Sequence, residues 1–229
     1  MAFRKKADLI LAHRPDILIV PECEHPDKLK FNTDTPKPTD MLWFGSNQHK
    51  GLGIFSYSNF RFKLLRNHDP ELKMIIPVKV TGGNFDFTLF AIWANNPNDP
   101  DGQYVEQVWK AIHHYDKKLK RKQTILAGDF NSNTIWDRKY RAGNHSNVVK
   151  RLQKKGIVSC YHTHRKQTQG KEEHPTFYLY RHQNKPYHLD YCFASADLAE
   201  KIESVEIGEH GFWTKHSDHV PVMVTFDLG

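Results

Sequence analysis

The sequence predicts an α/β fold in which two packed sheets are flanked by helices, within a single domain spanning residues 1–229. Short β-branched and aromatic segments recur along the chain, separated by Gly, Asn, Asp or Pro, as is typical of strands joined by turns. Between them lie a few segments with apolar residues at helical spacing. No linker, internal repeat or low-complexity segment divides the 229 residues, a length that fits one large domain.

The first part of the chain reads as a helix followed at once by a strand. Apolar residues at helical spacing predict a helix over residues 2–13. Pro15 ends it, because the residue before a proline avoids the α region. Residues 16–20 then carry four branched aliphatic side chains in a row, which indicates a strand buried on both faces. A helix leading into such a strand is typical of α/β folds.

The remaining elements follow the same two patterns. Strands rich in β-branched and aromatic residues are predicted at 41–44, 52–57, 62–65, 73–80, 85–93, 124–127, 157–161, 176–180, 188–194 and 220–226. Residues 81–85 predict a hairpin turn. One long helix is expected from Asp101 and Gly102 to Leu119, and a second from Ser146 to just before Gly156. The polar segment 163–175 predicts a solvated loop.

Composition narrows the range of partners. Lys plus Arg is 33 against 26 for Asp plus Glu, and the net charge of +7 favours nucleic acid, phosphorylated small molecules or anionic lipid head groups. The three cysteines are far apart and are expected to be buried free thiols, which fits a reducing compartment. No apolar run approaches the roughly 18 residues that cross a bilayer. We therefore expect a cytoplasmic, monomeric protein without a membrane span.

Acidic residues mark the ends of several core strands. A carboxylate beside a core strand lowers the free energy of unfolding unless it is paired, hydrogen-bonded or bound to metal. One such residue would usually be a satisfied structural Asp, but four strands that share the feature indicate convergence on one site. The residues concerned, with their polar neighbours, are Glu22, Asp129, Asn131, Asp190, Asp218 and His219.

Four short motifs give this pattern a specific meaning. "PDILIVPE", "GDFN", "HLDY" and "SDHVP", in this order over residues 15–221, resemble the endonuclease/exonuclease/phosphatase superfamily, the deoxyribonuclease-I-like fold. The resemblance implies a four-layered α/β sandwich with two mainly antiparallel sheets. It also implies hydrolysis of phosphate esters with a divalent metal, Mg²⁺ or Mn²⁺.

The resemblance further implies roles for the marked residues. Glu22 would be the main metal ligand and Asp218 a second, because hard oxygen ligands suit Mg²⁺. Asp129 would hold and deprotonate the attacking water. Asn131 would hydrogen-bond the phosphate, and His219 would stabilise the charge that develops on it. Asp190 would hold the His219 ring in one tautomer.

Residues around the motifs are candidates for contacting substrate. Trp93 takes the place where the family often has a Tyr or His, and Asn96 could supply an amide there. His188 flanks the site in sequence, although such a histidine is more often buried beside a site or on the surface. Glu24 would lie at the rim, and Pro21 replaces the usual Gln before the metal-binding Glu.

One family element is missing from the sequence. Family members begin with a strand that ends in an Asn, and only then enter the first helix, whereas this chain starts in that helix. Two interpretations remain open: the chain is a piece of a longer product, or it is a divergent member that lacks the strand. Removal of a central strand would leave exposed apolar edges.

Three functions are compatible with the sequence. The first is a metal-dependent phosphodiesterase acting as a nuclease, which the positive net charge favours. The second is hydrolysis of a phospholipid or phosphorylated small molecule on the same catalytic core. The third is a binding domain without catalysis, although such a domain has no need of this set of polar residues together.

Overall fold

The computed structural model describes residues 3–83, 85–95, 103–119 and 122–229. The strands are β1 (Ile17–Cys23), β2 (Asp40–Asn47), β3 (Lys50–Ser56), β4 (Arg61–Leu64), β5 (Ile75–Thr81), β6 (Phe87–Trp93), β7 (Thr124–Asp129), β8 (Ile157–Ser159), β9 (Phe177–Tyr178), β10 (Pro186–Tyr187), β11 (Asp190–Ser195), β12 (Ile202–Ile207) and β13 (Val222–Phe226). The α-helices are α1 (Ala7–Leu11), α2 (Val105–His114), α3 (His145–Gln153), α4 (Cys160–Arg165), α5 (Ala196–Ala199) and α6 (His210–Trp213). Short 3-10 helices lie at Phe3–Lys5, Pro26–Lys28, Pro70–Leu72, Thr134–Trp136 and Leu179–Arg181.

A six-stranded sheet in the order β4-β5-β6-β7-β11-β8 forms the largest layer. Its neighbouring strands are antiparallel, except for the parallel pair β6 and β7. In this register Asp190, the first residue of β11, lies opposite Asp129, the last residue of β7. Strand pairing alone therefore brings together two predicted site residues that are far apart in the sequence.

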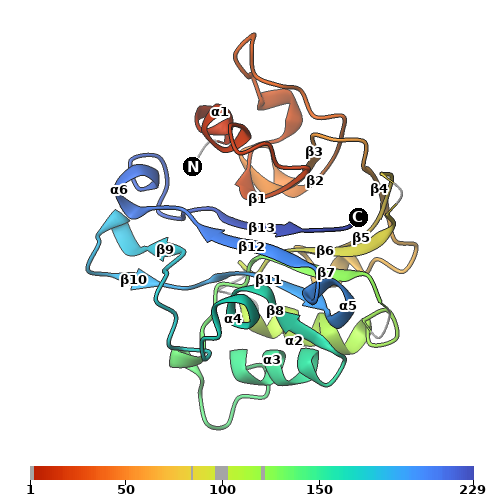
Figure 1. Cartoon of the computed structure of the whole chain (residues 1–229), viewed down its shortest axis with the longest axis vertical. Coiled ribbons are helices and arrows are strands. Elements are labelled where there is room, and N and C mark those ends of the chain that lie inside the picture. The colour runs from red at the N-terminus through yellow and green to blue at the C-terminus, as the bar shows by residue number, and fades with distance from the viewer. Residues whose placement is uncertain (1–2, 84, 96–102, 120–121) are drawn as a thin grey trace.

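A second layer of strands packs on one face of this sheet. It consists of a three-stranded part, β1-β3-β2, and a two-stranded part, β12-β13. Leu52 and Ile54 of β3 pack against strands β5 and β6, and Val205 of β12 packs near Cys192 of β11. Helices α2 and α3 cover the opposite face of the six-stranded sheet, while α1 lies outside the second layer (Figure 1). The predicted four-layered sandwich is confirmed.

The two parts of the second layer are separated by a groove. Among the described residues, β1 pairs with β3 alone and β13 with β12 alone, so one edge of each strand is left to line the groove. The groove has a volume of about 680 Å³, and its lining includes Phe87 and Leu89 of the six-stranded sheet. Five of the predicted site residues line this groove: Glu22, Asp129, Asp190, Asp218 and His219.

Several elements differ from the sequence prediction. The strand expected over 157–161 ends at Ser159, because Cys160 begins α4 and turns its buried side chain toward β11. Strand β12 was not predicted, since a register shift between Ile202 and Ser204 interrupts its alternation. The short helices α5 and α6 were also missed, because four residues carry no helical period. The start of the long helix at residues 101–102 lies outside the described residues.

The segment 163–175 is less solvated than predicted. Glu172 turns inward, where its carboxylate accepts a hydrogen bond from Nε2 of His162 at 3.0 Å and one from Asn133 at 3.1 Å. Burial alone would raise the pKa of Glu172, but these hydrogen bonds hold the pKa at about 2. The loop is therefore tied to the body of the protein by buried hydrogen bonds to Glu172.

The cysteine prediction agrees with the structure. Cys23, Cys160 and Cys192 are all buried and free. Within the described ranges, none of the helices has both the length and the apolar character that a bilayer crossing requires.

Candidate active site

Asp129 lies at the end of β7, with only 3% of its surface exposed. The preceding residue must be glycine: Gly128 has a φ of +134°, and a Cβ there would lie 2.0 Å from the carbonyl oxygen of Ile92. Asn131 then turns back with a φ of +48°, a conformation that Asn tolerates better than most residues. Its backbone N and Nδ2 donate to the Asp129 carboxylate at 2.8 and 3.2 Å.

The environment of Asp129 favours the protonated form. Burial is the main cause, and the negative charge of Asp190 adds to it, so that the pKa of Asp129 rises to about 7. His219 and the Asn131 backbone partly oppose the shift. A carboxyl group with this pKa is matched to proton transfer near neutral pH.

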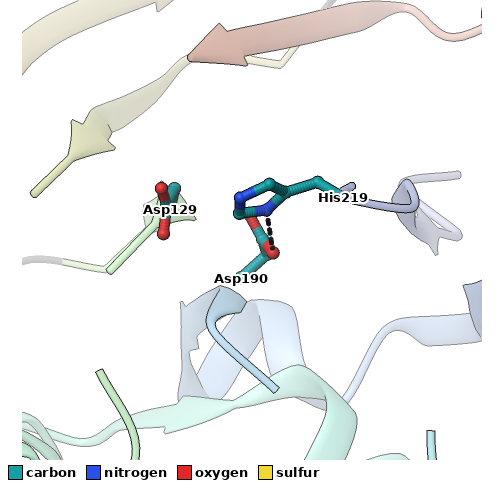
Figure 2. A group of neighbouring side chains, drawn as sticks. All are labelled: Asp129, Asp190 and His219. Carbon is teal, nitrogen blue, oxygen red and sulfur yellow. Dashed lines mark hydrogen bonds and ion pairs between the residues drawn. The ribbon is translucent and has the colours of Figure 1, made fainter. Parts of the chain in front are cut away.

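His219 and Asp190 form the second half of the cluster. Nδ1 of His219 donates to Oδ2 of Asp190 at 2.9 Å, and Figure 2 shows Asp190 below the ring and Asp129 to one side of it. Polar atoms of Asp129, Asp190 and His219 all lie within 4.8 Å of one another. Burial would lower the pKa of His219, but the nearby carboxylates, Asp190 above all, raise the pKa to about 9. The ring is therefore a cation at neutral pH, with Nε2 available for a further hydrogen bond.

This pairing predicts a measurable titration. In chelator-treated protein, the His219 ring should titrate near pH 9, and the pKa should fall toward the ordinary value of 6.5 in Asp190→Asn. Because the folded pKa is the higher one, the pair stabilises the protein below about pH 6.5, and this stability is lost as the pH rises through 9. Two-dimensional NMR of the ¹⁵N-labelled histidine rings measures this pKa directly. An unchanged pKa in Asp190→Asn would show that another group holds the proton.

Thr176, just before β9, connects the two elements that carry these side chains. Its side chain is fully buried, and its Oγ1 accepts hydrogen bonds from the backbone N–H groups of Leu189 and Asp190 at 2.9 and 3.0 Å. Its carbonyl oxygen accepts from Val220 N at 2.8 Å. Thr176 therefore fixes the start of β11 relative to the chain that follows His219.

Loss of this hydroxyl should be costly. Thr176→Val keeps the side-chain shape but leaves two buried N–H groups without their acceptor, which we expect to lower the free energy of unfolding by about 1–3 kcal/mol. Urea unfolding at constant pH measures the change. Thr176→Ser retains the oxygen and serves as the control, and equal losses in the two variants would point to lost packing instead.

Glu22 and Asp218 lie in the same groove. Glu22 has a φ of +58° within an irregular part of β1, between Val20 and Cys23, where the pairing register with β3 shifts. Both residues line the groove together with Asp129, Asp190 and His219. The left-handed backbone at Glu22 directs its carboxylate into the groove. The regular alternation of side chains along a strand would not have distinguished Glu22 from Glu24.

The oxygen donors of these residues fit a divalent ion such as Mg²⁺ or Mn²⁺. Oε1 of Glu22 lies 2.6 Å from Nζ of Lys50. Burial would raise the pKa of Glu22, but the hydrogen bond and charge of Lys50 lower it below the usual value, so the carboxylate is ionised as a metal ligand must be. His219 is less suited to coordination, since its ring is protonated and its Nδ1 is bound to Asp190.

Two further predicted residues, Trp93 and His188, do not line the groove. Trp93 is buried at the end of β6, where Nζ of Lys50 lies 5.5 Å from its ring centre. His188 is 3% exposed, packs against the ring of Tyr161 and bonds the carbonyl of His174. Asn96 lies outside the described residues. Trp93 pairs with Asp129 across β6 and β7, and contact of Trp93, His188 or Asn96 with substrate stays a prediction.

Glu24 also differs from its predicted place at the rim. It is buried, its Oε2 accepts a hydrogen bond from Phe3 N at 2.6 Å, and it forms an ion pair with Arg4. Glu24 thus anchors the start of the chain on the end of β1, while Glu22 faces the groove.

Residues 7–219 match the sequence model of the Endonuclease/Exonuclease/phosphatase family. No curated protein matches the chain.

Several solved structures share the fold at low sequence identity. The endonuclease domain of TRAS1, a telomere-specific non-LTR retrotransposon, has 16% identity and a TM-score of 0.64, covering 100% of this chain and 96% of that one. The 3'-5' exonuclease NExo from Neisseria meningitidis has 20% identity and a TM-score of 0.66, covering 98% and 94%. An AP endonuclease from Archaeoglobus fulgidus has 17% identity and a TM-score of 0.67, covering 99% and 96%.

Proposed function

The chain belongs to the endonuclease/exonuclease/phosphatase family and is a hydrolase of phosphate esters, and from this premise we propose that it is a divalent-metal-dependent nuclease. The observation that carries the proposal is the group of Asp129, Asp190 and His219 in the groove, beside the carboxylates of Glu22 and Asp218. We further propose that the 229 residues act as one catalytic domain and work as a monomer.

The proposed roles follow from the protonation of each group. Asp129, with its pKa near 7, takes a proton from the attacking water. The imidazolium of His219 donates from Nε2 to a phosphate oxygen and stabilises the negative charge that grows there. Asp190 keeps the ring charged and oriented through Nδ1.

Asn131 and the metal complete the proposed mechanism. Asn131 holds Asp129 through two hydrogen bonds, and the second N–H of its amide would donate to a phosphate oxygen once substrate enters. Glu22 and Asp218 would hold Mg²⁺ or Mn²⁺. When bound, this ion would neutralise phosphate oxygens and assist the leaving oxygen.

A nucleic-acid substrate is supported by two observations. The net charge of +7 favours association with a polyanion. NExo from Neisseria was solved bound to a product DNA hairpin, and it shares this fold at 19% identity with a TM-score of 0.65. We propose a cytoplasmic setting, which the three free cysteines fit.

A substrate panel tests this proposal. The protein is incubated with supercoiled plasmid, a chromogenic phosphodiester and phospholipid vesicles, each with Mg²⁺, Mn²⁺ or chelator. Metal-dependent nicking of the plasmid is the expected result. Release of a lipid head group without nicking would replace the nuclease with a phospholipase-type activity, and an absence of turnover on every substrate would favour a binding domain.

A further inference from the structure

Lys6 lies inside the candidate active site although no motif contains it. It lines the same groove as Glu22, Asp129, Asp218 and His219. Its position is fixed by the residues on either side, because Phe3 and Ala7 are both buried in the cluster that packs on β1. Lys5, by contrast, points to solvent.

One hydrogen-bond chain connects Lys6 to the loop that carries His219. Nζ of Lys6 donates to Oγ of Ser217 at 3.1 Å, and the same oxygen accepts from the backbone N of His219 at 3.3 Å. Ser217 is itself buried. The ammonium group of Lys6 is thus held near Asp218, the residue between Ser217 and His219.

The charge environment of Lys6 is acidic. Burial lowers its pKa below the usual value, while Asp218, Glu22 and Glu24 act in the opposite direction, with Asp218 the strongest of the three. Glu24 already pairs with Arg4, and Glu22 with Lys50. Lys6 therefore adds a positive charge next to the two carboxylates assigned to the metal, where a divalent ion would also sit.

We propose that Lys6 is a positioning residue that holds the Ser217–His219 loop and whose positive charge opposes the incoming divalent ion. This inference rests on the proposed function in one respect, the assignment of Glu22 and Asp218 to the metal. Before metal binds, the positive charge of Lys6 would partly neutralise Glu22 and Asp218, which limits the repulsion between these two carboxylates. The same charge weakens metal affinity, because like charges at close range repel.

Metal affinity tests this role without any turnover. Lys6→Met keeps the length and the apolar stem but removes the charge, and we expect it to bind Mn²⁺ about tenfold more tightly than the unmodified chain. Lys6→Arg retains the charge and should bind as the unmodified chain does. Lys5→Met removes a solvent-exposed charge one position away and is the matched control. The dissociation constants come from electron paramagnetic resonance of free Mn²⁺ in a titration at low salt.

Loop order supplies the second readout. In Lys6→Met, hydrogen–deuterium exchange of residues 217–219 should be faster without metal, since the bond to Ser217 is gone. Equal Mn²⁺ affinity in Lys6→Met and Lys5→Met would overturn the role of Lys6 and leave the proposed function standing. If the unmodified chain itself binds no Mn²⁺, the metal assignment falls and the role of Lys6 falls with it.

Discussion

Replacement of His219 by alanine is expected to lower kcat for phosphodiester cleavage about 10³-fold, because the transition state loses its only assigned imidazolium. The ring is held by Asp190 at 2.9 Å and is protonated at neutral pH, with a pKa of about 9. Its removal takes away both a charged donor and the partner of a half-buried carboxylate. Single-turnover cleavage of plasmid or a short duplex measures the loss.

A measurement of metal binding shows whether His219→Ala loses activity through the missing ring or through loss of the metal site. Glu22 and Asp218 are unchanged in His219→Ala, so Mn²⁺ binding should be retained, and it should become tighter rather than weaker because a positive charge near these carboxylates is removed. His216→Ala is the matched control, because His216 lies three residues away and does not line the groove. Near-normal turnover by His219→Ala would refute the assignment of this residue.

Asp129→Asn is the second change with a large expected effect. The amide cannot accept a proton from water, so kcat should fall by about 10³-fold, within the range found for loss of a general base. The unmodified chain should lose activity tenfold per pH unit below about pH 7, because Asp129 becomes protonated there. A rate that is flat between pH 5 and 8 would exclude Asp129 as the base.

The same substitution should stabilise the fold. The pKa of Asp129 is raised in the folded state, so its ionisation opposes folding, and stability is lost as the pH rises from about 4 through 7. At pH 8, Asp129→Asn should therefore be more stable than the unmodified chain by about 4 kcal/mol, and at pH 4 the difference should nearly vanish. Urea unfolding at the two pH values measures this. If Asp129→Asn is both more stable and inactive, Asp129 is a residue that lowers the stability of the fold and is needed for catalysis.

The sequence anticipated the architecture because its strands carry strong local signals. Strand β1 is a run of branched aliphatic residues, and α2 has a clear helical period. The missed elements have weak signals, as in β12, where a register shift breaks the alternation. The groove between β1 and β13 was not predicted, because it depends on which strands pair with each other and no local sequence pattern specifies that.

The site was predictable only in part from local motifs. Asp129, Asp190 and His219 were placed by motif and are brought together by the pairing of β7 with β11 and by the chain before β13. Lys6 and Thr176 were not found, because their contacts join positions 211 and 14 residues apart and have no local pattern. His188 was a candidate because it is near Asp190 in sequence, but it points into the core.

The central claim is that this groove cleaves phosphodiesters with a divalent metal and His219. Its most direct test is the initial rate of plasmid nicking by chelator-treated protein as Mn²⁺ is restored, with His219→Ala purified in parallel. We predict no cleavage in chelator, a rate that rises and saturates with Mn²⁺, and no such rise for His219→Ala. Equal cleavage with and without chelator, or an identical rise in both proteins, would contradict the account.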